Sequence, residues 1–139
     1  MAFHPYLFFG GNCREAFTRY QEIFGGELVL LAMSDLPPGE DPPPAGKEHY
    51  IMHAAIKYDG NLLMGSDDPM ADEFGPVQGM QVNYTAPDLD DANRVFDALA
   101  DGGEVWQALT PTFFSPGFGM CKDRFGTPWM IDVDAPEPT

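Results

Sequence analysis

The sequence predicts an α+β fold built from two tandem βαβββ modules. Each half of the chain combines short apolar runs with one segment whose apolar residues recur at helical spacing. The tetrapeptide Gly25-Gly26-Glu27-Leu28 returns as Gly102-Gly103-Glu104-Val105, each time after the helical segment and at the start of an apolar run. Gly60 and Gly126 each lie between two apolar runs and are followed by a methionine four residues later. The shared order, caps and turn glycines indicate an internal duplication.

The first module is predicted to cover about residues 1–67. Residues 3–9 form an aromatic strand that stops at a glycine turn, and Asn12 is expected to cap the following helix with its side chain. Glycines 25 and 26 end that helix, and residues 27–33 form the second strand. A hairpin of residues 50–57 and 61–66, turning at Asp59-Gly60, completes the module.

Two irregular segments separate these elements. Residues 34–48 carry five prolines, which lack the backbone amide that a strand ladder needs, so a loop is expected there. An acidic linker of about residues 68–78 joins the modules. Asp67 and Asp68 are expected to form an exposed turn at the start of this linker.

The second module, about residues 79–134, repeats the order of the first. Residues 80–85 form a strand, a helix begins at Asp88 and ends at the second glycine pair, and residues 104–109 form the next strand. The closing hairpin lies within residues 113–133 and turns at Gly126, where a glycine accepts positive φ without a Cβ penalty. The side chain of Asp123 is expected to cap this turn.

A cleft follows from this architecture. The 139 residues form one ordinary domain, yet each module has one helix to cover its sheet and leaves the other face bare. We therefore expect the modules to form a curved mixed sheet around a central cleft, with the helices on the outer face. Such a cleft is the expected binding site.

The charge and the cysteines restrict partners and compartment. Seven basic and 22 acidic residues give a net charge of -15, which disfavours nucleic acid and anionic membranes and favours a cationic ligand. Because the chain shows neither a secretory leader nor an apolar run of the roughly 20 residues that span a bilayer, a cytoplasmic protein is expected. Cys13 and Cys121 are then expected to be free thiols.

Five short motifs carry a resemblance to a known family: Pro5-Tyr6-Leu7-Phe8-Phe9, Asn12-Cys13-Arg14-Glu15-Ala16, Phe24-Gly25-Gly26, Ser66-Asp67 and residues 123–131. They resemble the PhnB-like branch of the vicinal oxygen chelate superfamily, which also contains glyoxalase I, extradiol dioxygenases, fosfomycin-resistance proteins and bleomycin-binding proteins. The resemblance covers nearly the whole chain and implies a single domain over residues 1–139. Superfamily members of this size are commonly homodimers, so self-association is expected.

The resemblance also implies where a metal would bind. Catalytic members hold a divalent ion with His, Gln or Glu from the first and last strand of each module. Here the last-strand positions fall on Met64 and Met130, whose thioethers are poor ligands for hard or borderline ions. The first-strand positions fall on Gln81 and near His4, which leaves at most these two ligands. We therefore predict no metal cofactor.

A small-molecule-binding role follows from the same positions. Most aromatic and methionine side chains are expected in the core, while a subset lines the cleft as an apolar, polarizable wall. His53 is either a hydrogen-bonded histidine of the pocket wall or, as the one candidate catalytic residue, an acid or base. The predicted ligand-binding residues are Tyr6, Phe8, His53, Met64, Gln81, Asn83, Phe114 and Met130.

Three functions remain open from the sequence. The first is a metal-free protein that binds a small apolar or cationic molecule, as the bleomycin-binding members do. The second is a metal-dependent lyase, isomerase or dioxygenase with the displaced ligands His4, His53 and Gln81. The third is an interaction module. Members of the branch are often described as 3-demethylubiquinone 3-methyltransferases, but the chain lacks a glycine-rich strand-to-helix turn followed by an acidic residue, so methyl transfer is not expected.

Overall fold

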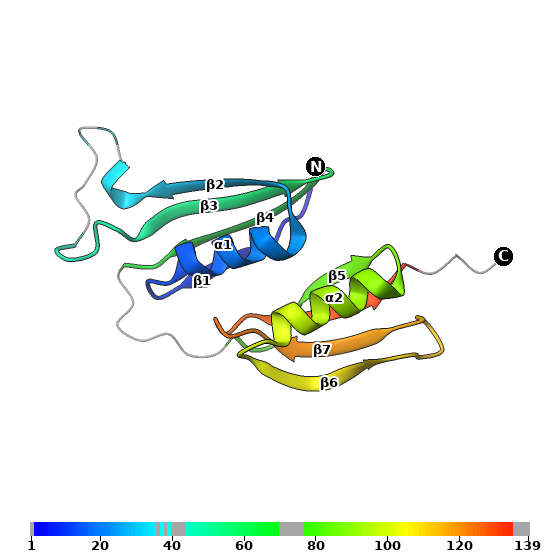
Figure 1. The fold of residues 1–139 in the computed structure, drawn as a ribbon. Coiled ribbons are helices and arrows are strands. Elements are labelled where there is room, and N and C mark those ends of the chain that lie inside the picture. Colours follow the sequence, from blue (N-terminus) through cyan, green and yellow to red (C-terminus); the bar gives the residue numbers. More distant parts are fainter. Residues whose placement is uncertain (1, 36, 38, 40–43, 70–76, 135–139) are drawn as a thin grey trace. The chain divides into compact units, whose positions relative to one another are not determined.

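The computed structural model describes residues 2–35, 37, 39, 44–69 and 77–134. The chain divides into two compact units, Met1–Gly75 and Pro76–Thr139. Within the described residues, each unit contains one α-helix and one four-stranded mixed sheet (Figure 1). The predicted order of two βαβββ modules is therefore confirmed. Residues 36, 38 and 40–43 of the predicted loop and residues 70–76 of the predicted linker lie outside the described residues.

The first unit has the sheet order β1-β4-β3-β2, in which β1 and β4 run parallel and the other neighbours antiparallel. The hairpin between β3 and β4 turns at Asp59 (φ 49°) and Gly60 (φ 79°), because two consecutive positive φ values match the twist of a two-residue hairpin. A 3₁₀ turn, Met33–Asp35, follows β2. The elements are β1 (Tyr6–Phe9), α1 (Cys13–Phe24), β2 (Glu27–Ala32), β3 (Ile51–Tyr58) and β4 (Asn61–Asp67).

The second unit repeats this topology as β5-β8-β7-β6, again with its first and last strands parallel. The closing hairpin turns at Gly126 (φ 96°) as predicted, but its first strand starts at Phe118 rather than near residue 113. The elements are β5 (Val82–Ala86), α2 (Leu89–Ala100), β6 (Glu104–Thr110), β7 (Phe118–Lys122) and β8 (Pro128–Val133).

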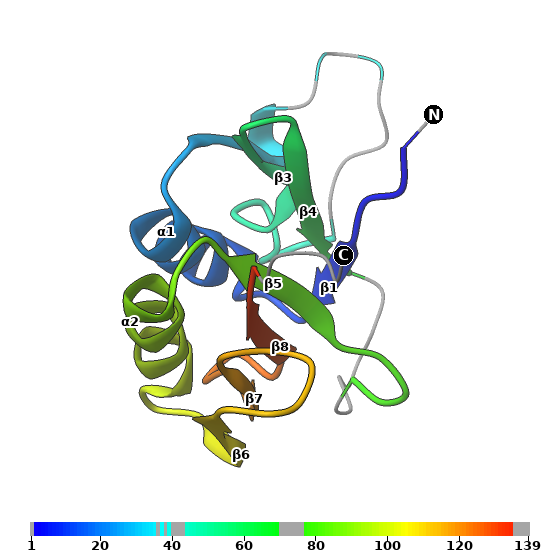
Figure 2. The same ribbon diagram turned by 90° about the vertical axis from the view of Figure 1, so that its right-hand side faces the viewer.

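Each helix covers one face of its own sheet (Figure 2). Glycines under the helices permit the close packing: a Cβ on Gly65 would lie 2.6 Å from the Phe17 ring of α1, and one on Gly119 would lie 2.9 Å from the Phe96 ring of α2. The buried helix residues are Cys13, Ala16, Phe17, Tyr20 and Ile23 in α1, and Ala92, Val95, Phe96 and Leu99 in α2.

The repeated glycine pairs have the same structural role in both units. Gly25 and Gly102 have φ values of 78° and 77° at or just after the helix ends, where a left-handed residue is needed. A Cβ on the second glycine would lie 2.5 Å from the Lys57 carbonyl oxygen at Gly26, and 2.1 Å from that of Lys122 at Gly103. The second glycine thus lets the strand after the helix approach its neighbour's backbone.

The start of α1 differs from the prediction. Among the described residues, the Asn12 side chain makes no capping hydrogen bond. The cap comes instead from Asp67, whose Oδ1 accepts from the amides of Gly11 (2.8 Å) and Cys13 (3.0 Å) and whose Oδ2 accepts from Ile51 (2.8 Å). Asp67 is 3% exposed, so the prediction of an exposed turn was wrong for this residue. Its carboxylate joins β4 to the helix start and to β3.

The second unit has a helix cap at Asp88 and the predicted turn cap at Asp123. Asp88 caps α2 by accepting a hydrogen bond from the Asp91 amide (2.8 Å). Asp123 accepts from the amides of Phe125 (2.9 Å) and Thr127 (3.0 Å) in the closing turn. Its second oxygen accepts from the indole of buried Trp129 (2.8 Å). The closing turn is thereby fixed to the core under α2.

A second hydrogen-bonded carboxylate lies at the start of α2. The Tyr84 hydroxyl of β5 and the Arg94 guanidinium both donate to Asp91. Burial by itself would raise the pKa of Asp91, but the hydrogen bonds from Tyr84 and Arg94, together with the Arg94 charge, outweigh it and lower that pKa.

Candidate functional site

The helix-free face of each sheet carries most of the predicted ligand-binding residues. In the first unit, Leu7, Phe9 and Ala54 are buried on the side of α1. Since side chains alternate along a strand, Tyr6, Phe8 and His53 point to the opposite face. Met64 joins them there as the register partner of Tyr6.

Tyr6 links the residues of this face. Its hydroxyl lies 3.3 Å from Nδ1 of His53, within hydrogen-bond distance. Its ring centroid lies 5.2 Å from that of Phe8 and 5.9 Å from that of His53. His53 is half-buried, and its contact with the Tyr6 hydroxyl fits the hydrogen-bonded alternative. The acid or base role of His53 stays a prediction.

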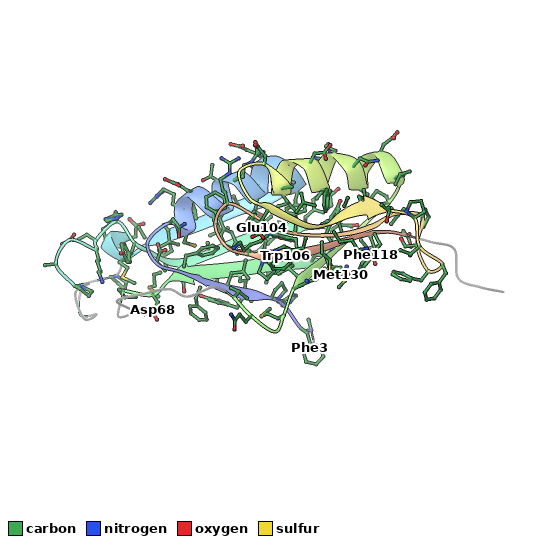
Figure 3. All side chains as sticks on the ribbon, turned by 90° about the horizontal axis from the view of Figure 1, so that it is seen from below. Phe3, Asp68, Glu104, Trp106, Phe118 and Met130 are labelled. Carbon is green, nitrogen blue, oxygen red and sulfur yellow. The ribbon has the colours of Figure 1, made fainter. Side chains whose placement is uncertain are left out.

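In the second unit the helix-free face carries methionines, amides and an acid. Trp129, Ile131 and Val133 of β8 are buried on the side of α2, so Met130 and Asp132 between them point to the other face. The register places Asn83 and Met120 on either side of Met130. Figure 3 labels Met130 and Phe118, which lie on the adjacent strands β8 and β7.

Two hydrogen bonds order the amides of this face. Nε2 of Gln81 donates to Sδ of Met120 (3.4 Å), and Nδ2 of Asn83 donates to the carbonyl oxygen of Met130 (3.2 Å). Gln81 precedes β5, and its side-chain amide contacts Met120 on β7, the third strand of this sheet. The structure thus places Gln81, Asn83 and Met130 on one face of the sheet. The prediction that all three contact one ligand requires this placement.

Fewer aromatic side chains than predicted lie in the core. Among the described residues, Phe9, Phe17, Tyr20, Phe96 and Trp129 are buried, whereas Phe8 is 60% exposed and Phe113 is fully exposed. Phe114 lies in the segment between β6 and β7, half exposed, with its ring 5.1 Å from that of Phe118. A single helix per sheet cannot cover both faces, so these side chains remain partly exposed.

The predicted metal positions have the following surroundings. The register pairs Met64 with Tyr6 and Met130 with Asn83, so neither methionine has a carboxylate or imidazole as its direct parallel-strand partner. His4 precedes β1 and is exposed. Within residues 2–35, 37, 39, 44–69 and 77–134, no group of three or more His, Cys, Asp or Glu side chains could hold a metal ion. The metal-free prediction itself stays a prediction.

The two cysteines are buried free thiols. Burial and the nearby Asp67 carboxylate raise the pKa of Cys13 to about 12, and burial with Asp123 raises that of Cys121 to about 11. A thiol with such a pKa is almost wholly protonated near neutral pH and is a poor nucleophile. In the described part of the chain, no helix is long and apolar enough to cross a membrane.

Sequence reasoning missed Asp132, Met120 and Phe118 as members of the second helix-free face. Asp132 is half-buried, and its Oδ1 is buried without a hydrogen-bond partner among the described residues; the same holds for Oε1 of Gln81. The alternation from Met130 to Asp132 is the signal that could have found this acid. Met120 and Phe118 required the register of β7 against β8.

The family model described as 3-demethylubiquinone-9 3-methyltransferase matches residues 1–132. The chain belongs to this family. Protein YjdN of Escherichia coli (strain K12) is 33% identical over 147 residues, which cover 100% of this chain and 99% of that protein.

Solved structures extend the likeness of this PhnB-like chain. Protein PA1353 from Pseudomonas aeruginosa has 41% identity and a TM-score of 0.83, covering 96% of this chain and 98% of that one. A PhnB protein from Bacillus cereus has 25% identity and a TM-score of 0.76, covering 96% and 100%. The fosfomycin resistance protein FosX from Listeria monocytogenes shares the fold at 9% identity and a TM-score of 0.64, covering 97% and 93%. The fold is that of the vicinal oxygen chelate superfamily.

Proposed function

We propose that this PhnB-like protein binds a small, partly apolar molecule on its helix-free sheet faces without the usual catalytic metal. The observation that carries the proposal is the composition of those faces: Met64 and Met130 stand at the last-strand positions, beside Tyr6 and Asn83. Thioether and aromatic groups offer a polarizable apolar surface, and the nearby amides can orient a ligand.

Calorimetric titration of the purified protein with Zn²⁺, Ni²⁺ and Mn²⁺ tests the metal-free part of this proposal. We expect no tight, stoichiometric binding of any of the three ions, because thioethers are poor ligands for them. Met130→Glu is the informative variant, since it places a carboxylate at the family's ligand position. Tight stoichiometric binding by the wild-type protein would contradict the proposal.

The alternative is a metal-dependent lyase, isomerase or dioxygenase that uses His4, His53 and Gln81. His53 lies beside the Tyr6 hydroxyl, and the Gln81 amide nitrogen donates to Met120. Metal analysis of protein purified without chelator, with alanine variants of both histidines, tests this alternative. A metal content that falls in both variants would favour it over the metal-free proposal.

Methyl transfer, the activity in the family's description, needs a site for a methyl donor. The turn between β1 and α1 is the place where a glycine-rich loop and a helix start could bind such a cofactor. Here Asp67 accepts hydrogen bonds from the amides of Gly11 and Cys13, so a carboxylate of the chain itself occupies the place where the cofactor would bind. We expect no heat of binding in a titration with S-adenosylmethionine; saturable binding would restore methyl transfer as a candidate.

Self-association as a homodimer is part of the proposal. β6 is an edge strand of its sheet and carries the exposed side chains Val105 (52%) and Trp106 (44%), the latter labelled in Figure 3. A second copy would cover such an edge. Light scattering during size-exclusion chromatography should return twice the chain mass, whereas a monomer at micromolar concentration would contradict this part.

A further inference from the structure

A buried carboxylate oxygen on the second helix-free face has no donor within the described chain. This atom is Oδ1 of Asp132 on β8. The neighbouring Thr85 hydroxyl does not supply a donor, because it lies 3.3 Å from Asn83 Oδ1 and donates there. A buried carboxylate oxygen is stable when it accepts a hydrogen bond and costly when it does not. Because the Asp132 side chain as a whole is half-buried, a rotation of its carboxyl group can bring this oxygen to a hydrogen-bond donor of a bound molecule.

Among the described residues of this unit, the basic side chains pair with acids other than Asp132. Lys122 lies on the same face, but it is opposite Pro128, at the other end of β7 from the register partner of Asp132. The basic side chains described in this unit pair with other acids, as Arg94–Asp91 (2.8 Å), Lys122–Glu104 (3.6 Å) and Arg124–Asp101 (3.3 Å). With a net charge of -15, the whole chain favours a cationic molecule at such a site.

Aromatic rings lie beside this carboxylate. Phe118 is the register partner of Asp132 across the β7–β8 ladder, so the two side chains share a face. The Phe114 ring packs edge-on against Phe118, with centroids 5.1 Å apart and planes at 76°. Phe114 is half exposed and can contact a molecule from solvent. The faces of aromatic rings attract cations, and their area contacts apolar groups.

The polar atoms of this face that have no partner among the described residues require a hydrogen-bond donor. Besides Asp132 Oδ1, the buried Oε1 of Gln81 has no partner among the described residues, and it too is an acceptor. A ligand that complements the face must therefore bring N–H or O–H groups. A positive charge on the donor would in addition compensate Asp132.

We propose that this face binds a protonated organic amine with an aromatic or apolar body. The ammonium group donates to Oδ1 of Asp132, and the carbon skeleton packs against Phe118 and Phe114. A primary or secondary amine fits better than a quaternary one, because the carboxylate oxygen needs a donor hydrogen. This inference rests on the proposed small-molecule-binding function and names its ligand class.

The test is an NMR titration of the ¹⁵N-labelled full chain with three matched probes. These are 2-phenylethylamine, the neutral 2-phenylethanol and the quaternary trimethyl(2-phenylethyl)ammonium ion. Asp132→Asn removes the charge with little change of shape, and Asp134→Asn is the control, because Asp134 is an exposed acid two residues further on. Phe114→Ala removes an aromatic ring from the segment between β6 and β7 and leaves every strand residue unchanged.

We expect the amine to give saturable shifts at residues of β7 and β8. The alcohol, and the amine with Asp132→Asn, should bind about tenfold or more weakly, as loss of a charge-assisted hydrogen bond implies. Asp134→Asn should change affinity less than about twofold, since exposed charges interact weakly. Phe114→Ala should weaken binding of all aromatic probes.

Several results would overturn the inference. Equal affinity for amine and alcohol, or equal losses in the Asp132 and Asp134 variants, would refute an amine site while leaving a small-molecule-binding function in place. Equal binding of the quaternary probe would refute the hydrogen bond to Asp132. No saturable shift with any probe would refute the site, and tight binding of Zn²⁺, Ni²⁺ or Mn²⁺ alongside it would refute the proposed function as well.

Discussion

Removal of the Asp67 carboxylate should destabilise the first unit strongly. Asp67→Ala leaves the amides of Gly11, Cys13 and Ile51 without their acceptor, and the bonds to Cys13 and Ile51 are buried. Each unsatisfied buried donor costs about 1–3 kcal/mol, and the three share one acceptor group, so we expect a total loss of about 4 kcal/mol in the free energy of unfolding. Asp67→Asn keeps an oxygen for one side of the site and should lose about half of that.

Urea unfolding followed by circular dichroism measures these losses. Asp35→Ala is the matched control, because Asp35 is an exposed acid of the same unit whose side chain accepts a backbone hydrogen bond from Ala32 (3.0 Å). That variant should lose about 1 kcal/mol. If Asp67→Ala costs no more than Asp35→Ala, the carboxylate does not hold β4, β3 and the start of α1 together, and the reasoning fails.

Three further predictions concern other parts of the structure. Gly103→Ala should lower the free energy of unfolding by at least about 3 kcal/mol, because its Cβ would overlap a strand carbonyl group. Gly102→Ala should lower it by about 1–2 kcal/mol, because residue 102 has a positive φ. Equal losses in thermal unfolding would contradict this difference. The two buried cysteines have pKa values raised to about 12 and 11. In the folded protein at pH 8 neither should react with Ellman's reagent, and both should react after denaturation. Rapid labelling of the folded protein would contradict their burial. Tyr84→Phe should raise the lowered pKa of Asp91, as carboxyl NMR would detect. The stability that this carboxylate contributes is present above its unfolded pKa and disappears as the pH falls through the folded pKa, so in the variant the contribution should be smaller and its loss should be complete at a higher pH.

Local chemistry explains why the order of elements could be predicted. The first glycine of each pair, the Asp59-Gly60 hairpin turn, and the caps at Asp88 and Asp123 act on backbone groups within a few residues of themselves. Such contacts depend little on the rest of the fold. The periodicity of the apolar residues adds the helices and strands, and the repeat adds the shared topology of the two units.

The Asn12 prediction failed because a cap from a distant strand replaced the local one. Asp67 lies 54 residues from Cys13 in the chain, and parallel pairing of β1 with β4 brings it to the start of α1. The sequence shows the motif Ser66-Asp67, but it does not show which backbone amides donate to Asp67. Nothing local distinguishes a carboxylate that ends a buried strand from one in an exposed turn.

The sequence by itself determined the two-module order and the turns. Only the tertiary structure decided which side chains share a face: it placed Asp132 beside Phe118 and left Phe8 and Phe114 exposed instead of in the core. The physical reason is that strand register and burial depend on pairings between segments far apart in the chain. A shift of one residue in strand register would turn Phe8, Phe118 and Asp132 to the opposite face of their sheets.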